Sequence, residues 1–310
     1  MSQRILVLGA GGVGGYFGGR LAEGGADVTF ALRPARRKQI DARGIVIHSD
    51  FFDDASVSVN TVAAEAIEGP YDLVILACKA YQLGDVMETI APAVGDNTAI
   101  LPLLNGIKQI DLLQDRFGAD KVLGGTCYIG ARVDAETGDI VHFGDFHRIA
   151  YGEMDASLSP RVEAFAALND AMKFDIDLRD NIEQALWDKF AMLCAMSSVN
   201  TISRATVGEI LATPSGHEFL TAALIECRDT AAALGHIVSP ATIATYEKMF
   251  STQGSKFASS MLRDVQANKP SEGDHIIGDM VDRAQAAGLH TPIMLAARAG
   301  LAVHESRVAD

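Results

Sequence analysis

The alternation of apolar and polar positions changes character about halfway along the chain. In the first half, short apolar runs typical of strands alternate with stretches of helical spacing. This pattern predicts strands at residues 4–8, 27–32, 72–77 and 99–104, and a helix over residues 14–23. The continuous apolar runs are typical of strands buried on both faces. Strands that alternate with helices predict an α/β fold, a Rossmann-type doubly wound parallel sheet with helices on both faces.

The second half has helical spacing almost throughout, beginning near residue 181. Candidate helices cover residues 184–198, 216–234, 240–249, 259–266 and 271–287. The residues that break them are Pro214, Pro240, Pro270, Gly288 and Pro292. A polar stretch around Asp180 separates the two patterns. We therefore predict two domains, an α/β domain over residues 1–180 and an all-helical domain over residues 181–310.

Composition and charge exclude several classes of protein. The chain of 310 residues is 48% apolar and 21% charged, enough to bury a sizeable core without disulfides or metals. Its formal net charge of -14 argues against nucleic-acid and anionic-membrane partners. No apolar run approaches the ~18 residues of a bilayer-spanning helix, and the N-terminus lacks the layout of a signal peptide. We expect a cytoplasmic protein whose partner is a small molecule.

The spacings of cysteine and histidine point away from disulfides and metals. The four cysteines, Cys78, Cys127, Cys194 and Cys227, are scattered and form no CxxC motif. This pattern predicts reduced, buried thiols. The eight histidines show no HExxH or other metal-binding spacing, so no metal site is expected.

A glycine-rich turn follows the first predicted strand. The sequence Gly9-Ala10-Gly11-Gly12-Val13-Gly14 matches the GxGxxG pattern and lies between a strand and a helix. There Gly9 permits the tight turn, Gly11 allows close approach of a pyrophosphate, and Gly14 lets the helix pack on the strand. The N–H groups at the helix start face the anion. The turn therefore predicts a dinucleotide-binding site, and the competing interpretation is a glycine-rich turn that binds nothing.

The end of the second predicted strand bears on the choice of cofactor. NAD-binding domains usually carry Asp or Glu there, to hold the ribose 2′-hydroxyl. Here the strand ends in Ala31-Leu32-Arg33, and Arg36, Arg37 and Lys38 follow. Because a guanidinium can bind a 2′-phosphate bidentately, Arg33 favours NADP over NAD. The alternative interpretation is a solvated basic helix face that begins at Arg33 and includes Arg36 and Arg37.

Two further polar segments follow predicted strands. Lys79 and Gln82 come after the strand at residues 72–77, and Asn105-Gly106 follows the strand at residues 99–104. Ligands of doubly wound sheets collect at the carboxyl ends of strands, so Lys79 and Gln82 are expected near the cofactor. Asn-Gly is also a common turn pair, and for Asn105 an ordinary turn remains an equal alternative.

Together with later motifs, these features resemble the ketopantoate reductase (2-dehydropantoate 2-reductase) family over essentially the whole chain. The resemblance is carried by Gly9–Gly14 with Arg33, Cys78-Lys79-Ala80-Tyr81-Gln82, Asn105-Gly106, Trp187-Asp188-Lys189-Phe190, and Ser259-Ser260-Met261-Leu262-Arg263-Asp264 with Glu272. The later motifs are the more specific, because they are not general features of Rossmann domains. The resemblance implies a helical domain like that of 6-phosphogluconate dehydrogenase. It also implies hydride transfer from NADPH to the C2 ketone of a 2-keto acid.

The resemblance assigns a role to each site residue. Lys189 would be the general acid that protonates the developing alkoxide, and Glu272 would orient the substrate hydroxyl or the lysine, close to the cofactor. Ser260 would bind the substrate, at its carboxylate end, and Asn105 would lie between the nicotinamide and the substrate. Lys79 and Gln82 would line the adenosine-phosphate end, and the backbone at Ala131 would approach the nicotinamide. Hydride addition places negative charge on the ketone oxygen, which requires a proton donor or cation nearby.

Periodicity alone gives blander interpretations of two of these residues. Lys189 could equally be a snorkelling surface lysine, and Glu272 an acid in the first turn of a helix capped by Ser271. Desolvation in its apolar helix would lower the pKa of Lys189, and a neighbouring Glu272 would oppose that shift.

Two positions depart from the family pattern. Ketopantoate reductases usually carry Asn four and eight residues after the catalytic lysine, on the same helix face. This chain has Leu193 and Ser197 there, and Ser197 keeps a hydroxyl of shorter reach at a candidate substrate-binding position. Asn200 lies ~16 Å along the helix from Lys189, too far to replace the missing amides. A pocket that loses a buried amide discriminates less strongly for a substrate hydroxyl.

Three functional hypotheses follow. The leading one is NADPH-dependent reduction of 2-dehydropantoate (ketopantoate) to pantoate in pantothenate and coenzyme A biosynthesis, by a monomer or homodimer. The first alternative is a paralogous NADP-dependent dehydrogenase for a more apolar 2-keto or 2-hydroxy acid. The second alternative is a non-catalytic NADP sensor, against which the presence of Lys189, Ser260 and Glu272 argues.

Overall fold

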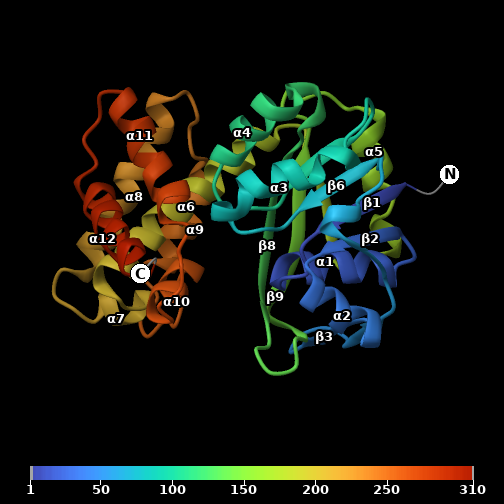
Figure 1. Ribbon diagram of the computed structural model, residues 1–310. Coiled ribbons are helices and arrows are strands. Elements are labelled where there is room, and N and C mark those ends of the chain that lie inside the picture. The colour runs from blue at the N-terminus through green and yellow to red at the C-terminus, as the bar shows by residue number, and fades with distance from the viewer. Residues whose placement is uncertain (1–2, 309–310) are drawn as a thin grey trace. The chain divides into compact units, whose positions relative to one another are not determined.

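The computed structural model describes residues 3–308, and it divides into two compact units (Figure 1). The α/β unit contains residues 3–104 and Gln109–Glu183. The helical unit contains Asn105–Lys108 and residues 184–308. The short segment Asn105–Lys108 therefore packs with the helices, although it follows a strand of the α/β unit.

The first sheet of the α/β unit has five parallel strands in the order β5-β2-β1-β6-β7. The bounds are β1 Arg4–Leu8, β2 Asp27–Leu32, β5 Asn60–Ala63, β6 Leu73–Leu76 and β7 Ala99–Pro102. Every residue of β6 and β7 is buried, as their continuous apolar runs predict. From the central β1 the chain builds outward in both directions, so the order reverses between β1 and β6. The predicted fold class, a Rossmann-type parallel sheet followed by a helical domain, is confirmed.

Helix α1 (Gly12–Glu23) contains glycines where it packs closely against the two sheets. A Cβ atom on Gly18 would lie 2.5 Å from the Phe30 ring in β2, and Gly14 lies on the same face. A Cβ atom on Gly15 would lie 2.5 Å from Ile140 of a second sheet, and Gly19 continues that face. Residues four apart share a helix face, so each face of α1 that meets a sheet carries a pair of glycines. The helix start is thereby fixed close to the end of β1.

The second sheet was not predicted from the sequence. Its strands are β3 Ile45–Ser49, β4 Ala55–Val57, β8 Gly124–Val133, β9 Ile140–Gly152 and β10 Asp175–Leu178. The long β9 pairs antiparallel with β8 and parallel with both β3 and β10. Residues 144–146 bulge out of β9, because Ile129 pairs with His147 and Gly130 pairs with Phe143. A bulge of this kind breaks the alternation of apolar and polar residues by which a strand is recognised.

The helices of the α/β unit other than α1 are α2 Pro34–Arg43, α3 Leu83–Ile90, α4 Lys108–Phe117 (whose first residue groups with the helical unit) and α5 Pro160–Ala166. The helical unit contains α6 Ile182–Ser203, α7 Val207–Leu211, α8 Gly216–Ala233, α9 Pro240–Met249, α10 Ser260–Gln266, α11 Asp279–Ala286 and α12 Pro292–Val308. A π-helical segment, η6 (Asp274–Gly278), leads directly into α11.

The predicted helices match this unit with a few differences. Helix α6 is longer at both ends than predicted, and the helix expected over residues 271–287 is a π-helical segment followed by α11. The N-cap of the π-helical segment is Gly273 and not Ser271, so the predicted cap is wrong, although the Ser271 Oγ accepts a hydrogen bond of 3.2 Å from the Gly273 N–H. Helix α12 was not predicted. Its apolar residues also lie on the exposed face, where Leu295 is 50% and Val303 49% exposed, which weakens the amphipathic signal.

Other expectations concern the thiols, metals and membranes. Cys127, Cys194 and Cys227 are buried, but Cys78 is only partly buried, so the prediction of buried thiols is wrong for Cys78. Within residues 3–308, no group of three or more His, Cys, Asp and Glu side chains is arranged to hold a metal ion. No helix in that part of the chain is both long enough and apolar enough to cross a bilayer.

Candidate active site

Three predicted cofactor-binding segments follow neighbouring strands of the first sheet. The glycine turn follows β1, Arg33 follows β2, and Lys79 comes three residues after β6. Because β2, β1 and β6 are adjacent and parallel, these segments lie at the same edge of the sheet. Ligands of doubly wound sheets bind at this edge. Gly9 has a φ of +90°, a left-handed conformation that glycine adopts without strain, as the predicted tight turn requires.

Within the glycine turn, the residues differ in what surrounds them. A Cβ atom on Gly12 would lie 2.5 Å from the carbonyl oxygen of Ala131 in β8, and one on Gly14 would lie 2.3 Å from the carbonyl oxygen of Gly9. A Cβ atom on Gly11, the N-cap of α1, would meet nothing within 4 Å. The protein thus packs against Gly12 and Gly14, while Ala10 is buried and Val13 partly buried. The open side at Gly11, beside the helix N-terminus, fits an anionic group such as a pyrophosphate.

The basic residues after β2 are used differently from one another. Arg33 is the exposed N-cap of α2, and its side chain makes no hydrogen bond or ion pair within residues 3–308. Arg36 is half-buried and donates to three acceptors, so the alternative of a solvated basic face is wrong for Arg36. Arg37 donates to Thr61 at 3.2 Å and pairs with Asp41 at 3.5 Å. Of these three arginines, only Arg33 keeps an uncommitted guanidinium at the end of β2.

Lys79 is the N-cap of a short 3₁₀ helix, η2 (Ala80–Gln82), and Gln82 is its last residue. The Lys79 N–H lies 3.4 Å from the side-chain oxygen of Gln82, and the Gln82 N–H donates to the Lys79 carbonyl at 2.9 Å. Both side chains are half-buried at the edge where the cofactor is expected. Part of the role of Gln82 is therefore to hold the backbone of this turn.

The predicted catalytic and substrate-binding residues all belong to the helical unit. Lys189, Ser197, Ser260 and Glu272 come from its helices and from the segment before η6, and Asn105 joins them through the segment Asn105–Lys108. The remaining predicted residues, Gly9–Gly14, Arg33, Lys79, Gln82 and Ala131, belong to the α/β unit. Of the predicted cofactor-binding residues, Asn105 and Glu272 therefore lie in the helical unit with the substrate set, and the others lie in the α/β unit.

The two residues before Lys189 anchor the first turns of α6. The neighbouring Asp188 carboxylate accepts hydrogen bonds from the Ser239 N–H at 3.2 Å and from the Thr242 hydroxyl at 2.9 Å, at the start of α9. On the other side, the Trp187 ring stacks on His236 with centroids 4.6 Å apart. Lys189 is half-buried, which both a catalytic and a snorkelling lysine can be.

On the helix face of Lys189, the residues of the next two turns of α6 are buried. Leu193 is 8% exposed, and Ser197 is completely buried. The Ser197 hydroxyl has no hydrogen-bond partner among residues 3–308. A buried polar group without a partner is destabilising by about 1–3 kcal/mol, and such groups frequently mark functional positions. The apolar Leu193 lies one helical turn from the lysine, where the family usually has an amide.

At the start of α10, Ser259 and not Ser260 caps the helix. The Ser259 Oγ accepts the Leu262 N–H at 3.1 Å. Ser260 makes no hydrogen bond with its hydroxyl in the described residues and is half-buried. From the sequence, Asn200 is only too distant a substitute for the missing amides, and its contacts were not predicted: its buried side chain accepts the Ser259 N–H at 3.0 Å and donates to the Ala205 carbonyl at 2.8 Å. Asn200 therefore supports the helix start that presents Ser260.

Glu272 lies between Ser271 and Gly273, the N-cap of the π-helical segment η6. It is only 6% exposed, unlike an acid that merely solvates the first turn of a helix. Segments of π-helix are rare and occur frequently at functional sites. Asn105 is half-buried, makes no side-chain hydrogen bond within residues 3–308, and precedes Gly106, which has a φ of +91°. The chain therefore bends at Asn105-Gly106, and the Asn105 amide stays uncommitted within residues 3–308.

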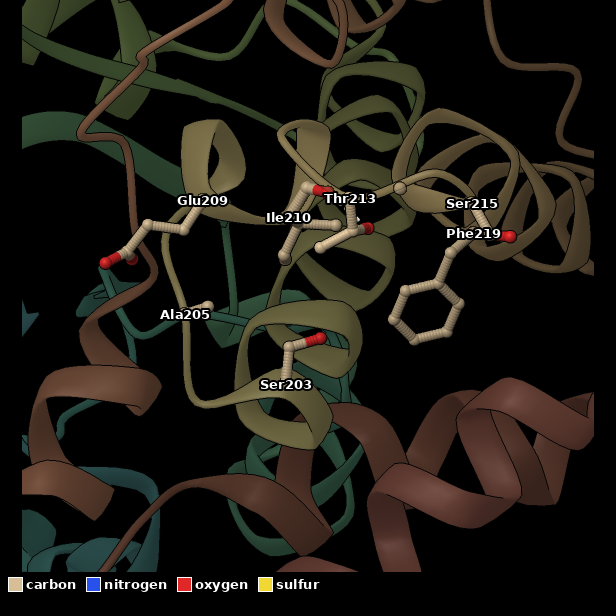
Figure 2. Close-up of a pocket in the computed structure, with 8 residues that line it drawn as sticks. Ser203, Ala205, Glu209, Ile210, Thr213, Ser215 and Phe219 are labelled. Carbon is tan, nitrogen blue, oxygen red and sulfur yellow. Dashed lines mark hydrogen bonds between the residues drawn. The ribbon is translucent and has the colours of Figure 1, made fainter.

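A pocket lies elsewhere in the helical unit (Figure 2). It has a volume of about 420 Å³ and is lined by residues from the end of α6, from α7 and from the start of α8, among them Ser203, Ile210 and Phe219. The Glu209 carboxylate at its rim accepts the Thr206 N–H at 2.7 Å, so it caps α7. No predicted site residue lines this pocket.

His275, within η6, gives the helical unit a sensitivity to acid. Burial and, to a lesser degree, the Lys108 ammonium lower its pKa to about 4, against the opposing effect of Asp274. An unfolded histidine has a pKa of about 6.5, so between pH 6.5 and 4 the unfolded chain binds a proton that the folded chain does not. Stability is therefore complete above that window and is lost as the pH falls through it.

We expect the free energy of unfolding to fall by about 2 kcal/mol between pH 7 and pH 5 through His275 alone. Urea unfolding at both pH values measures this difference. The His275→Gln variant should lose that part of the pH dependence, whereas His217→Gln, an exposed histidine of α8, should retain it. An unchanged slope in His275→Gln would contradict the assignment.

The fold and the glycine turn define the class of the protein. A parallel sheet with a GxGxxG turn, followed by a helical domain that carries a lysine, serine and glutamate set, is the plan of a two-domain, dinucleotide-dependent oxidoreductase. Comparison with protein families gives the particular assignment. The profile of ketopantoate reductase PanE/ApbA matches residues 5–156, and the profile of the C-terminal domain of the same family matches residues 181–301. The chain belongs to the ketopantoate reductase PanE/ApbA family, whose members are oxidoreductases that use a nicotinamide cofactor.

Individual relatives span the whole chain. The uncharacterized oxidoreductase YkpB of Bacillus subtilis (strain 168) is 35% identical over 98% of this chain and 99% of its own. The crystal structure of 2-dehydropantoate 2-reductase from Methylococcus capsulatus has a TM-score of 0.86 and 26% identity, and the match covers 99% of this chain and 98% of that one. The ternary structure of D-mandelate dehydrogenase with NADH and anilino(oxo)acetate has a TM-score of 0.84 at 22% identity, covering 99% of this chain and 100% of that one, a likeness of fold.

Proposed function

We propose that this protein reduces a 2-keto acid to the 2-hydroxy acid with NADPH, and that 2-dehydropantoate is its first candidate substrate. The observation that carries the proposal is that Lys189, Ser260, Glu272 and Asn105 all belong to one unit of the fold. The Ser260 hydroxyl and the Asn105 amide have no protein partner within residues 3–308, so both can contact a ligand. In this proposal residues 1–180 bind the dinucleotide, and residues 181–310 with the segment Asn105–Lys108 bind the keto acid.

The α/β unit supplies the groups that would hold the cofactor. The open side at Gly11 and the N-terminus of α1 would hold the pyrophosphate, and Arg33 would hold the 2′-phosphate of the adenosine ribose. Lys79 and Gln82 would line the adenosine-phosphate end, and the backbone at Ala131 would lie beside the nicotinamide. When bound, the reduced nicotinamide supplies the hydride.

The helical unit supplies the groups that act on the keto acid. As the ketone carbon becomes tetrahedral, its oxygen gains negative charge, and Lys189 would donate the proton that neutralises it. The Ser260 hydroxyl would donate a hydrogen bond to the substrate carboxylate. Glu272 would orient the lysine or a substrate hydroxyl, and Asn105 would hold the substrate on the nicotinamide side. The buried Ser197 hydroxyl is a further candidate contact for the substrate.

The proposed preference for NADPH depends on Arg33. We expect Arg33→Ala to raise the KM for NADPH about 30-fold and to leave the KM for NADH within about twofold, because a charge-assisted bidentate contact contributes ~1.5–3 kcal/mol. Initial rates with both cofactors at a fixed concentration of keto acid measure the ratio. Lys38→Ala, an exposed basic residue on α2, is the matched control. An unchanged preference for NADPH in Arg33→Ala would remove the 2′-phosphate role.

A second candidate substrate class is favoured by Leu193. This buried leucine lies one turn after Lys189, where a hydroxylated substrate such as 2-dehydropantoate would gain from a polar partner. The structure of D-mandelate dehydrogenase with anilino(oxo)acetate shows that the same fold is found in an enzyme of an aryl-substituted 2-hydroxy acid. A 2-keto acid with an apolar or aromatic side chain is therefore the alternative to 2-dehydropantoate.

A panel of keto acids, with NADPH oxidation as the readout, tests the function. Higher kcat/KM with 2-dehydropantoate than with phenylglyoxylate or 2-ketoisovalerate supports the first candidate, and the reverse order supports the apolar one. NADPH binding without turnover on any member of the panel would refute the proposed reaction and would favour a sensor. Pantothenate and coenzyme A biosynthesis is the proposed pathway only in the first case.

A further inference from the structure

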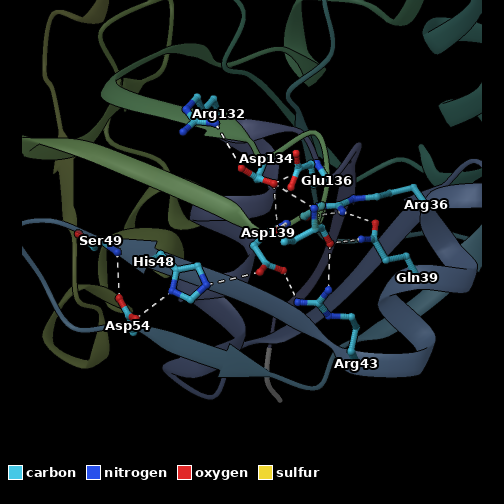
Figure 3. A network of polar contacts seen from close by, with 12 residues as sticks. Arg36, Gln39, Arg43, His48, Ser49, Asp54, Arg132, Asp134, Glu136 and Asp139 are labelled. Carbon is cyan, nitrogen blue, oxygen red and sulfur yellow. Dashed lines mark hydrogen bonds and ion pairs between the residues drawn. The ribbon is translucent and has the colours of Figure 1, made fainter.

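The turn between β8 and β9 is held against α2 by a polar network (Figure 3). Arg36, Gln39 and Arg43 lie three and four residues apart, on one face of α2, and all three reach this turn. Gln39 donates to the Thr137 carbonyl at 2.5 Å, and Arg43 donates to the same carbonyl at 2.9 Å. Arg43 also pairs with the Asp139 carboxylate. The turn is therefore attached to the helix that begins directly after Arg33.

Arg36 extends this network to the glycine turn. Its Nη1 donates to the Gly138 carbonyl and to the side-chain oxygen of Gln39, both at 2.6 Å. Its Nε donates to the carbonyl of Ala10, within the GxGxxG segment, at 3.2 Å. One guanidinium thus joins the glycine turn, α2 and the β8–β9 turn. Burial lowers the pKa of Arg36, but an arginine remains charged at any working pH.

The β8–β9 turn is a rigid support for this contact. The Asp134 carboxylate accepts the N–H groups of Glu136 and Thr137 at 3.0 and 2.9 Å, and these hydrogen bonds hold its pKa below the usual range. The Gly138 N–H donates to the Asp134 carbonyl at 2.9 Å, which closes the turn. On the β8 side of the same hairpin, the Ala131 carbonyl packs against Gly12. The hairpin therefore meets the glycine turn directly at Gly12 and, through Arg36, at Ala10.

We propose that Arg36 is a positioning residue for the dinucleotide, because it holds the glycine turn in place through the Ala10 carbonyl. This inference rests on the proposed function, in which the glycine turn holds the pyrophosphate and Arg33 holds the 2′-phosphate. Arg36 directs its donors at two backbone carbonyls and a side-chain amide, so it acts through the turn and not on the phosphate itself. The pyrophosphate is common to NADPH and NADH. Loss of Arg36 must therefore weaken both cofactors equally.

Steady-state kinetics with the two cofactors test this role. We expect Arg36→Met to raise the KM for NADPH and the KM for NADH by the same factor, about tenfold, with kcat at saturating cofactor within about twofold of the wild type. Arg36→Lys should show an intermediate effect, because one ammonium cannot reach both the Ala10 and the Gly138 carbonyls. The Arg33→Ala variant should show the opposite signature, a loss confined to NADPH. Titration of each protein with each cofactor, followed by fluorescence, gives the dissociation constants.

Arg37→Met is the matched control, because Arg37 is the next residue of the same helix and contacts Thr61 and Asp41 instead of the glycine turn. It should leave both KM values unchanged. A loss in Arg36→Met that is confined to NADPH would overturn the proposal and make Arg36 a 2′-phosphate ligand. Unchanged KM values for both cofactors would also overturn it. Should Arg36→Met be too unstable to assay, Arg36→Lys gives the same comparison. Failure of the wild type to bind either cofactor would instead refute the proposed function.

Discussion

Replacing Lys189 with alanine is expected to lower kcat for keto acid reduction roughly 1,000-fold while the KM for NADPH stays within about twofold. The reason is that a positioned general acid contributes ~10²–10⁴-fold to the rate, and Lys189 is the proposed proton donor to the ketone oxygen. Because such a lysine acts on the transition state and not on the cofactor, kcat and kcat/KM for the keto acid should fall together. Initial rates over a matrix of both substrate concentrations measure these parameters.

The fold around Lys189 has a convenient internal probe. Trp187 is the sole tryptophan of the chain and lies two residues before the lysine. Its ring stacks on His236. Unchanged Trp187 fluorescence in Lys189→Ala would show that the start of α6 is intact. Lys248→Ala, an exposed lysine on α9, should retain full activity. A kcat for Lys189→Ala close to that of the wild type, with normal fluorescence, would refute the catalytic assignment.

Local patterns predict the first sheet and the glycine turn because each signal there lies within a few residues. β1, β2, β6 and β7 are short apolar runs, and Gly9 and Gly14 have the conformation and close contacts that the GxGxxG pattern requires. The helix was expected to begin at residue 14 and begins at Gly12, within the usual uncertainty of helix ends.

The second sheet could not be predicted, because its pairing depends on segments far apart in the sequence. β9 pairs with β3, almost 100 residues earlier, and carries a bulge at residues 144–146. Its contribution to the site is equally non-local: Arg36 is one basic residue among several after β2, and only the hairpin tip at Gly138 shows that it is committed. The same holds for Asn200, whose sequence gives no indication that its amide holds the Ser259 backbone.

The role of each substrate-binding residue was implied by family resemblance and not by periodicity. Local sequence could not show that Ser259, and not Ser260, caps α10, or that the Ser197 hydroxyl lacks a partner. It also could not show that the segment Asn105–Lys108 packs with the helical unit. These features depend on tertiary packing, and the Ser260 hydroxyl and the Asn105 amide have no partner within residues 3–308.

Replacing Gly11 with valine is expected to raise the dissociation constant for NADPH at least about 100-fold with little change in the melting temperature. Gly11 has a φ of -76°, which any residue adopts, and a Cβ atom there meets no protein atom within 4 Å. The fold therefore tolerates the side chain, and the added methyl groups would occupy the space proposed for the pyrophosphate. Thermal unfolding and fluorescence titration with NADPH separate the two effects.

The neighbouring Gly12 supplies the contrast that makes this prediction specific. A Cβ atom on Gly12 would lie 2.5 Å from the Ala131 carbonyl oxygen, so Gly12→Ala should displace the β8–β9 hairpin and lower the melting temperature. We expect Gly11→Val to weaken cofactor binding at an unchanged melting temperature and Gly12→Ala to lower the melting temperature. Together the two results identify which side of the turn faces the ligand. If Gly11→Val binds NADPH as tightly as the wild type, the pyrophosphate does not lie at Gly11, and the placement of the dinucleotide on this turn is wrong.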